Sequence, residues 1–228
     1  MALSKAKGNM YSWVTNVHTH LGGKCPHGCN YCYVQNMHYK PEKYKGDLRL
    51  IEKELDVNYG KDKTIFIEHC NDLFATALPD EWRLKILEHC RKYPDNTYVF
   101  QTKNPSNYLH LLDKMPEKSI LGVTIETNRH YPEIMMESPT PKCRYISMIQ
   151  LIGSPTFITI EPILAFDLDI LAHWIMDINP TFVNIGADSK GRGLPEPSWQ
   201  DIQMLIRILR ESGIKVNEKS NLKRLEVK

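Results

Sequence analysis

Short segments rich in Val, Ile, Thr and aromatic residues recur along this sequence of 228 residues, and helical patterns separate them. Most of these segments are continuous apolar runs that lack the strict alternation of a strand with one face in water. A strand covered on both faces has this pattern, so the sequence predicts a parallel sheet. The predicted strands are Trp13–Thr19, Thr64–Glu68, Thr97–Thr102, Ile120–Glu126, Thr156–Glu161, Thr181–Ile185 and Ile214–Asn217.

Between the predicted strands, apolar residues recur at the spacing of a helix face. We expect helices around residues 48–55, from Asp80 to about residue 90, after the pair Asn104–Pro105, and over Pro197–Ser212. The segment Met135–Pro141 is rich in proline and is predicted to be a loop.

Strands that alternate with helices form right-handed βαβ units around a parallel sheet, which is either open or rolled into a barrel. About six or seven such units are too few for a complete barrel of eight. The predicted fold is therefore a partial α/β barrel with parallel strands, in a single domain that spans residues 1–228. In such folds the chemistry takes place beyond the C-terminal ends of the strands.

Composition and charge exclude several classes of protein. The 29 basic and 27 acidic side chains give a net charge of +2, too small for a strong field toward nucleic acid or an anionic membrane. No apolar run approaches the roughly 20 residues that span a bilayer, and the first residues lack the apolar stretch of a secretory signal. We expect a soluble, cytoplasmic protein with no membrane partner, whose cysteines stay reduced.

The motif with the most specific chemistry follows the first predicted strand. Cys25, Cys29 and Cys32 have the spacing C-x3-C-x2-C within a glycine-rich segment, residues 20–35, which we call the cluster loop. Iron–sulfur clusters prefer thiolate ligands, and three cysteines would leave one iron of a 4Fe–4S cluster open for chemistry. The alternative is a zinc site that makes the protein a non-enzymatic binding module with a structural metal. Its fourth ligand would be one of the nearby histidines, which are His18, His20, His27 and His38.

The three cysteines, with the aromatic Tyr31 just before the third, resemble the signature of the radical S-adenosylmethionine (radical SAM) superfamily. The resemblance implies a partial (β/α)6 barrel of the TIM type. It implies a 4Fe–4S cluster on Cys25, Cys29 and Cys32, with SAM chelated to the open iron and Tyr31 beside its adenine. One electron from an external reductant would cleave SAM to methionine and a 5′-deoxyadenosyl radical, which abstracts a hydrogen atom from the substrate.

Polar residues follow the other predicted strands, at the end where a barrel places its site. In the superfamily, a segment that is often Gly-Gly-Glu grips the SAM amino group at the end of the second strand. This sequence lacks the glycines there, and Glu68 and Asn71 are the candidates. A helix cap or a salt bridge at a strand–loop junction is the alternative role for each acidic residue. The further candidates for SAM contacts are Thr102, Thr124, Glu126, Asn128 and Glu161.

Phrases such as Leu-Gly-Val-Thr-Ile-Glu-Thr-Asn are similar to those of a radical SAM subgroup common in phage and mobile elements, over about Trp13 to Gly191. The Tyr-Cys-Tyr ending of the cysteine motif is similar to that of spore photoproduct lyase. That ending alone does not carry over the DNA-repair reaction.

Cys70 follows the second predicted strand and is a candidate hydrogen-atom donor, whereas a buried inert thiol is the alternative. The basic C-terminal tail, residues 218–228, is expected to be solvated because its charges are mixed. The substrate is predicted to be polar, either a small molecule or a nucleic-acid component. The compact chain leaves little material above the barrel mouth, so the substrate is large or a partner chain closes the site.

Overall fold

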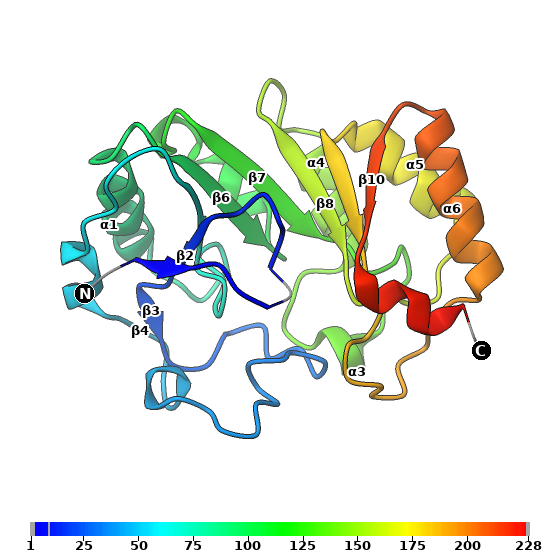
Figure 1. The fold of residues 1–228 in the computed structure, drawn as a ribbon, viewed down its shortest axis with the longest axis horizontal. Coiled ribbons are helices and arrows are strands. Elements are labelled where there is room, and N and C mark those ends of the chain that lie inside the picture. Colours follow the sequence, from blue (N-terminus) through cyan, green and yellow to red (C-terminus); the bar gives the residue numbers. More distant parts are fainter. Residues whose placement is uncertain (1–2, 9, 227–228) are drawn as a thin grey trace.

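A computed structural model describes residues 3–8 and 10–226 of the chain. In it, a curved sheet carries its helices on the outer side (Figure 1). The strands are β1 (Ser4–Lys5), β2 (Asn16–His18), β3 (Leu21–Gly22), β4 (Arg49–Leu50), β5 (Thr64–Ile67), β6 (Thr97–Thr102), β7 (Ser119–Thr124), β8 (Thr156–Ile160), β9 (Phe182–Ile185) and β10 (Lys215–Glu218). The α-helices are α1 (Asp80–Arg91), α2 (Ser106–Leu109), α3 (Pro132–Met135), α4 (Pro141–Met148), α5 (Leu168–Ile178) and α6 (Trp199–Glu211). Short 3₁₀ helices span Glu42–Tyr44, Glu52–Asp56, Leu112–Lys114 and Ser220–Leu225.

The main sheet has the parallel arrangement that the apolar runs predict. Its strands lie in the order β1-β2-β5-β6-β7-β8-β9-β10, and every neighbouring pair from β2 to β10 is parallel. Every residue of β8 is buried, as expected for a strand covered on both faces. The order does not close on itself, so the chain forms the predicted α/β partial barrel.

Two features of the first strands differ from the prediction. β2 is shorter than the predicted range 13–19, because Trp13 turns into the barrel and stacks on Tyr11 with 5.4 Å between the ring centroids. β1 was not predicted, and it pairs antiparallel with β2 through Ser4 and Val17. A two-residue strand has no periodicity in the sequence, which explains why it was missed.

The helices were predicted with mixed success. α6 is confirmed: Ser198 caps it by accepting a hydrogen bond from the Asp201 N–H, and its apolar stripe is buried. α5 has no counterpart among the predicted helices, because apolar residues lie on most of its faces and obscure the period. The predicted helix at residues 48–55 is wrong: the chain there forms β4, which pairs with β3, and then a 3₁₀ helix.

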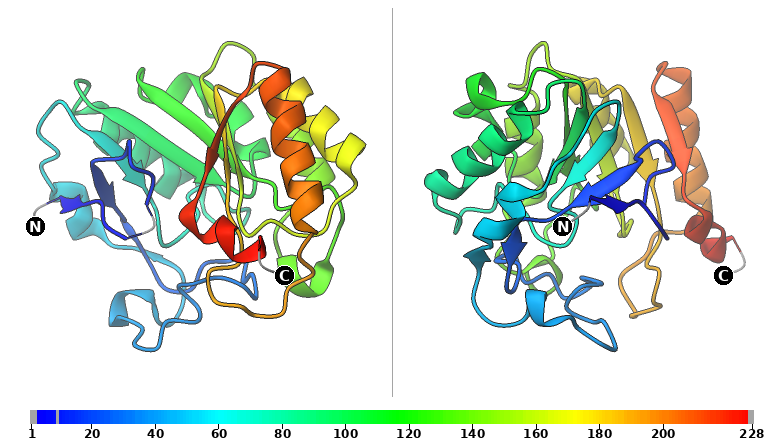
Figure 2. Two further views of the ribbon diagram at one scale, coloured as in Figure 1. Left: turned by 45° about the vertical axis from the view of Figure 1, so that its right-hand side comes forward. Right: turned by 60° about the vertical axis from the view of Figure 1, so that its left-hand side comes forward.

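Packing inside the partial barrel comes from the N-terminal segment. Tyr11 and Trp13 pack against Phe157 on the inner side of the sheet, with ring centroids 5.9 Å apart in both pairs. The larger core lies between the sheet and its outer helices and includes Ile158 of β8 and Leu171 of α5. Figure 2 shows α5 and α6 lying along the outer side of the sheet. Aromatic side chains therefore fill part of the barrel interior. A cavity remains at the C-terminal ends of the strands.

The predicted solvated tail at residues 218–228 is packed over its first part. Ser220–Leu225 forms a 3₁₀ helix that buries Leu222 and Leu225 against the core, since apolar residues alternate with the basic ones there. Residues 227 and 228 of the tail lie outside the described residues. No helix in the described part of the chain is long and apolar enough to cross a membrane.

Candidate functional site

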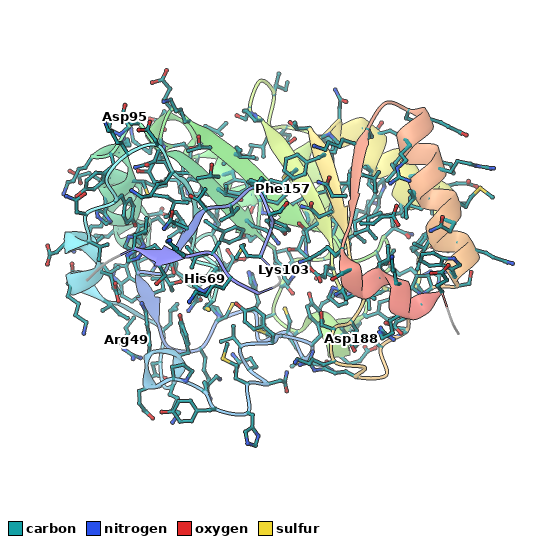
Figure 3. The ribbon with its side chains drawn as sticks, viewed as in Figure 1. Arg49, His69, Asp95, Lys103, Phe157 and Asp188 are labelled. Atoms are coloured by element: carbon teal, nitrogen blue, oxygen red, sulfur yellow. The ribbon has the colours of Figure 1, made fainter. Side chains whose placement is uncertain are left out.

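A cavity of about 570 Å³ lies at the C-terminal ends of the parallel strands, where the fold predicts the site. Figure 3 shows Lys103 and Asp188 at this lower end of the sheet, whereas Asp95, which precedes β6, lies at the opposite end. The cluster loop forms one wall, and residues at the ends of β5 to β9 form the others. Its size suits a cofactor of about drug size together with part of a substrate.

Cys25, Cys29 and Cys32 all line this cavity. Two turns bring them together, since the Gly28 N–H binds the Cys25 carbonyl and the Cys32 N–H binds the Cys29 carbonyl. Gly28 has a φ of +61°, which suits glycine at the turn. Burial raises the pKa of the Cys25 thiol, and the charges of Asp72, Cys29 and Cys32 raise it further. The charges of Cys29 and Cys32 thus reach the Cys25 thiol.

This set of residues fits an iron–sulfur cluster by its chemistry: three thiols from one loop meet a common cavity, and thiolates are the ligands such clusters use. Cys29 has only weak protein partners, the Met135 carbonyl at 3.8 Å and the Ser138 hydroxyl at 3.7 Å. Among residues 3–8 and 10–226, no group of three or more His, Cys, Asp or Glu side chains is arranged so that it could hold a single metal ion.

Three of the four histidines that could complete a zinc site have protein partners. His27 Nε2 lies 2.7 Å from Asp72 Oδ2, and His20 Nδ1 lies 2.8 Å from Glu68 Oε1. His18 Nε2 lies 3.2 Å from the carbonyl oxygen of Glu54. His38 is exposed to solvent. These bonds orient three of the four imidazoles toward protein groups.

Tyr31, the aromatic residue of the motif, is held at its hydroxyl and over one face of its ring. Its hydroxyl donates a hydrogen bond to Glu126, and the Lys103 ammonium lies 5.2 Å from the ring centroid. Glu126 is completely buried and also pairs with Arg144 at 2.7 Å and with Lys103 at 3.0 Å. Burial opposes ionisation of Glu126, but Arg144 and Lys103 lower its pKa to about 2. It is therefore a carboxylate at neutral pH.

Most of the predicted SAM contacts come together at the cavity. Those that line it are Tyr31, Glu68, Asn71, Thr102, Thr124 and Glu161. Glu126 lies behind Tyr31 and does not line it. Asn128 binds the Asp167 side chain at 2.8 Å, just before α5.

The carboxylate of Glu68 is bonded to the start of the cluster loop. It accepts hydrogen bonds from the main-chain N–H groups of His20 at 2.6 Å and Leu21 at 3.2 Å. Burial raises the pKa of Glu68 to about 7, although these N–H groups act in the opposite direction. Glu68 also has a φ of +61°, a conformation that costs a non-glycine residue energy.

Comparison with known proteins places this site in context. The family model described as "Protein of unknown function (DUF5131)" matches residues 11–178. The chain belongs to this family. No curated protein matches this DUF5131 chain.

Several solved structures share the fold of this DUF5131 protein. A spore photoproduct lyase variant matches with a TM-score of 0.60 and 12% identity, over 92% of this chain and 78% of that one. SuiB from Streptococcus suis, solved with its precursor peptide SuiA, has a TM-score of 0.61 and 9% identity, over 92% of this chain and 50% of SuiB. A radical SAM methyltransferase from Sphaerobacter thermophilus has a TM-score of 0.61 and 14% identity, over 92% and 67% of the two chains. The partial barrel of the DUF5131 protein is thus the fold found in radical SAM enzymes.

Sequence reasoning missed part of the DUF5131 cavity. Its inner surface contains Tyr11, whose hydroxyl donates to Gln101 at 2.7 Å and lies 2.6 Å from the Thr159 hydroxyl. Gln101 and Thr159 lie near the C-terminal ends of their strands. A polar residue at an inward position there indicates a site residue and could have been predicted from the sequence. Tyr11 had no such signal, because its approach to β8 depends on the path of the N-terminal segment.

Cys70 lies one layer behind the cavity wall of the DUF5131 protein. It is buried, and its sulfur lies 3.4 Å from the hydroxyl of Tyr33, which does line the cavity. Burial raises the pKa of Cys70. Of the other cysteines, Cys90 is buried within α1, and Cys143 is exposed on α4.

Proposed function

We propose that this protein is a radical SAM enzyme that binds a 4Fe–4S cluster through Cys25, Cys29 and Cys32 and reductively cleaves S-adenosylmethionine. When bound, the cluster supplies the electron, received from an external one-electron reductant, that produces the 5′-deoxyadenosyl radical. The three motif thiols on one cavity at the C-terminal ends of the strands carry this proposal. The fold shared with a radical SAM methyltransferase supports it.

The cavity residues have proposed roles in holding SAM. Tyr31, braced by Glu126 and Lys103, offers a fixed ring face for the adenine. Asn71, Thr102 and Thr124 supply neutral hydrogen-bonding groups at the ends of β5, β6 and β7. Glu161, held by Lys219 at 2.7 Å and Asn221 at 2.9 Å, is a carboxylate that could accept from ribose hydroxyls.

The substrate is proposed to be polar, because ion pairs border the cavity. Glu161 pairs with Lys219, and Asp188 lies 3.6 Å from Arg192. One neighbour was solved with bound AdoMet and a dinucleoside spore photoproduct, and another with a precursor peptide. We favour a nucleotide or nucleic-acid component, with a partner chain or the substrate itself covering the cavity.

Cys70 is retained as the candidate donor of a hydrogen atom to a product radical. Tyr33 stands between its thiol and the cavity, so this role requires the Tyr33 ring to move or to relay. Replacing Cys70 with Ala and obtaining the same product at the same rate would remove Cys70 from the mechanism.

The test of the proposal is anaerobic reconstitution with iron and sulfide, followed by reduction with dithionite in the presence of SAM. We expect a brown protein with about four irons per chain and formation of 5′-deoxyadenosine, measured by liquid chromatography and mass spectrometry. The matched control replaces Cys25, Cys29 and Cys32 with Ala together. A colourless protein that holds one zinc and leaves SAM intact would overturn the proposal in favour of a structural metal module.

A further inference from the structure

Asp72 is a buried carboxylate with an unusually complete set of hydrogen-bond donors. Its Oδ2 accepts from His27 Nε2 at 2.7 Å, the Thr102 hydroxyl at 2.9 Å and the Lys103 N–H at 2.9 Å. Its Oδ1 accepts from the Phe74 N–H at 2.9 Å. Burial opposes ionisation, but His27 and the other donors hold the pKa of Asp72 below its ordinary value. Asp72 is therefore a carboxylate whose charge stays inside the protein.

These donors belong to three separate parts of the chain. His27 lies inside the cysteine motif, between Cys25 and Cys29, whereas Thr102 and Lys103 end β6. Asp72 itself follows β5, so it ties the cluster loop to the ends of two neighbouring strands. Hydrogen bonds to a charged group are stronger than those between neutral groups. The carboxylate can thus hold the loop in place before any cluster is present.

The charge of Asp72 lies next to the cysteine motif. Asp72 and Cys25 line the same cavity, and the Asp72 carboxylate bonds to His27, which is two residues along the chain from Cys25. Among the described residues, no Lys or Arg side chain forms an ion pair with Asp72. Reduction of a bound cluster adds one electron from the external reductant and thus one negative charge at the same place.

From these contacts, and resting on the proposed function, we infer that Asp72 is a positioning residue for the cluster loop and lowers the reduction potential of the cluster that the loop holds. The tether acts through His27 and fixes the main chain between Cys25 and Cys29. The charge acts through space, because a fixed carboxylate beside a ligand sulfur disfavours the reduced, more negative state. A low potential makes the reduced cluster the stronger electron donor.

Asp72→Asn tests the charge, because it removes one negative charge and keeps an acceptor for His27. We expect the variant to load iron as the wild type does and to show a higher reduction potential in a redox titration followed by electron paramagnetic resonance. Asp188→Asn is the matched control, since Asp188 is also buried at this cavity but lies beside Arg192. An unchanged or lower potential in Asp72→Asn, with full iron loading, would overturn the role of the charge.

His27→Leu tests the tether on the cluster-free protein. It keeps the Asp72 charge but removes the bond, so hydrogen exchange at residues 25–32 should speed up at least tenfold, while His27→Gln should restore much of the protection. Exchange equal to wild type in His27→Leu would overturn the tether. If Asp72→Asn loads no iron, the variant Asp72→Glu tests whether a carboxylate is needed at this position. Iron loading restored by the longer carboxylate supports the proposal. Iron loading that is still absent overturns it. Failure of the wild type itself to load iron would instead reject the proposed function.

Discussion

Tyr31 donates a hydrogen bond to Glu126, so the aromatic residue of the cysteine motif is joined to a carboxylate with no exposed surface. The same carboxylate holds Arg144 and Lys103, and Lys103 also donates its main-chain N–H to Asp72. The cluster loop is thus bonded to two buried carboxylates, Glu126 through Tyr31 and Asp72 through His27. Both carboxylates also contact Lys103. Glu126 was predicted to contact SAM; in this arrangement it would act on SAM through the ring of Tyr31.

Breaking the Glu126–Arg144 pair should be strongly destabilising. Arg144→Met leaves a buried carboxylate with Lys103 as its remaining cation, and we expect a loss of about 3–5 kcal/mol in the free energy of unfolding, measured with urea. The double variant Glu126→Gln with Arg144→Met should recover part of that loss, since the fully buried carboxylate that lost its guanidinium partner is then removed, and the partly exposed Lys103 ammonium keeps access to solvent. A double variant less stable than Arg144→Met alone would contradict this account.

Stability should depend on the protonation of Glu68. Its pKa is raised by burial from 4.5 to about 7, so the folded state favours the protonated acid. The stabilisation is complete below about pH 4.5 and is lost as pH rises through about 7, a change of up to about 3 kcal/mol. We expect the stability difference between wild type and Glu68→Gln to shrink by this amount from pH 4 to pH 8.

Glu52→Gln, at an exposed position, is the control for the loss of a carboxylate. The pH dependence that Glu52→Gln shares with Glu68→Gln belongs to the removal of any carboxylate. A flat difference for Glu68→Gln would show that Glu68 has its ordinary acidity in the folded protein.

Gly23 should be intolerant of any side chain. A Cβ there would lie 2.0 Å from the Asp47 carbonyl oxygen, and the residue has a φ of +85°. Gly8 has a similar φ of +65° with nothing within 4 Å, so Gly8→Ala measures the conformational cost alone. We expect Gly23→Ala to be less stable than Gly8→Ala by about 1–3 kcal/mol in thermal unfolding and to load less iron, because Gly23 opens the cluster loop. Equal losses of stability in the two variants would mean that the main chain at Asp47 moves to make room for the Cβ.

Single cysteine variants should separate ligands from packing residues. Cys25→Ala, Cys29→Ala and Cys32→Ala should each lose most of the iron and the 5′-deoxyadenosine product after reconstitution, because a cubane held by two thiolates is poorly retained. Cys143→Ala should keep both, since Cys143 is exposed on α4 and away from the cavity. Iron retained in all three motif variants would point to ligands elsewhere.

Most of the parallel strands could be predicted, because they are largely buried and their apolar pattern is local in the sequence. Thr156–Ile160 is the clearest case, with every residue buried. The loop that carries the cysteines could also be predicted, since the motif and its glycines are adjacent in sequence. Both features depend on residues that are close together in the sequence, so they can be recognised without knowledge of the tertiary contacts.

The orientation of individual side chains could not be predicted in this way. Glu68 and Glu126 both follow strands, yet the first turns to the main chain at His20 and the second to Arg144. Which way each points depends on partners far away in the sequence. The same holds for Asp72, whose role depends on His27 from the cluster loop.

The contact between Tyr11 and Thr159 spans 148 residues of chain. Tyr11 and Trp13 are synthesised long before their partners Phe157 and Phe182. During most of synthesis these two aromatic rings therefore lack the contacts with Phe157 and Phe182. Contacts of such high sequence separation slow folding and leave apolar surface exposed in the meantime. The aromatic packing inside the barrel cannot be completed before Phe157 and Phe182 have been synthesised, and expression at low temperature or with a chaperone should raise the yield of folded protein.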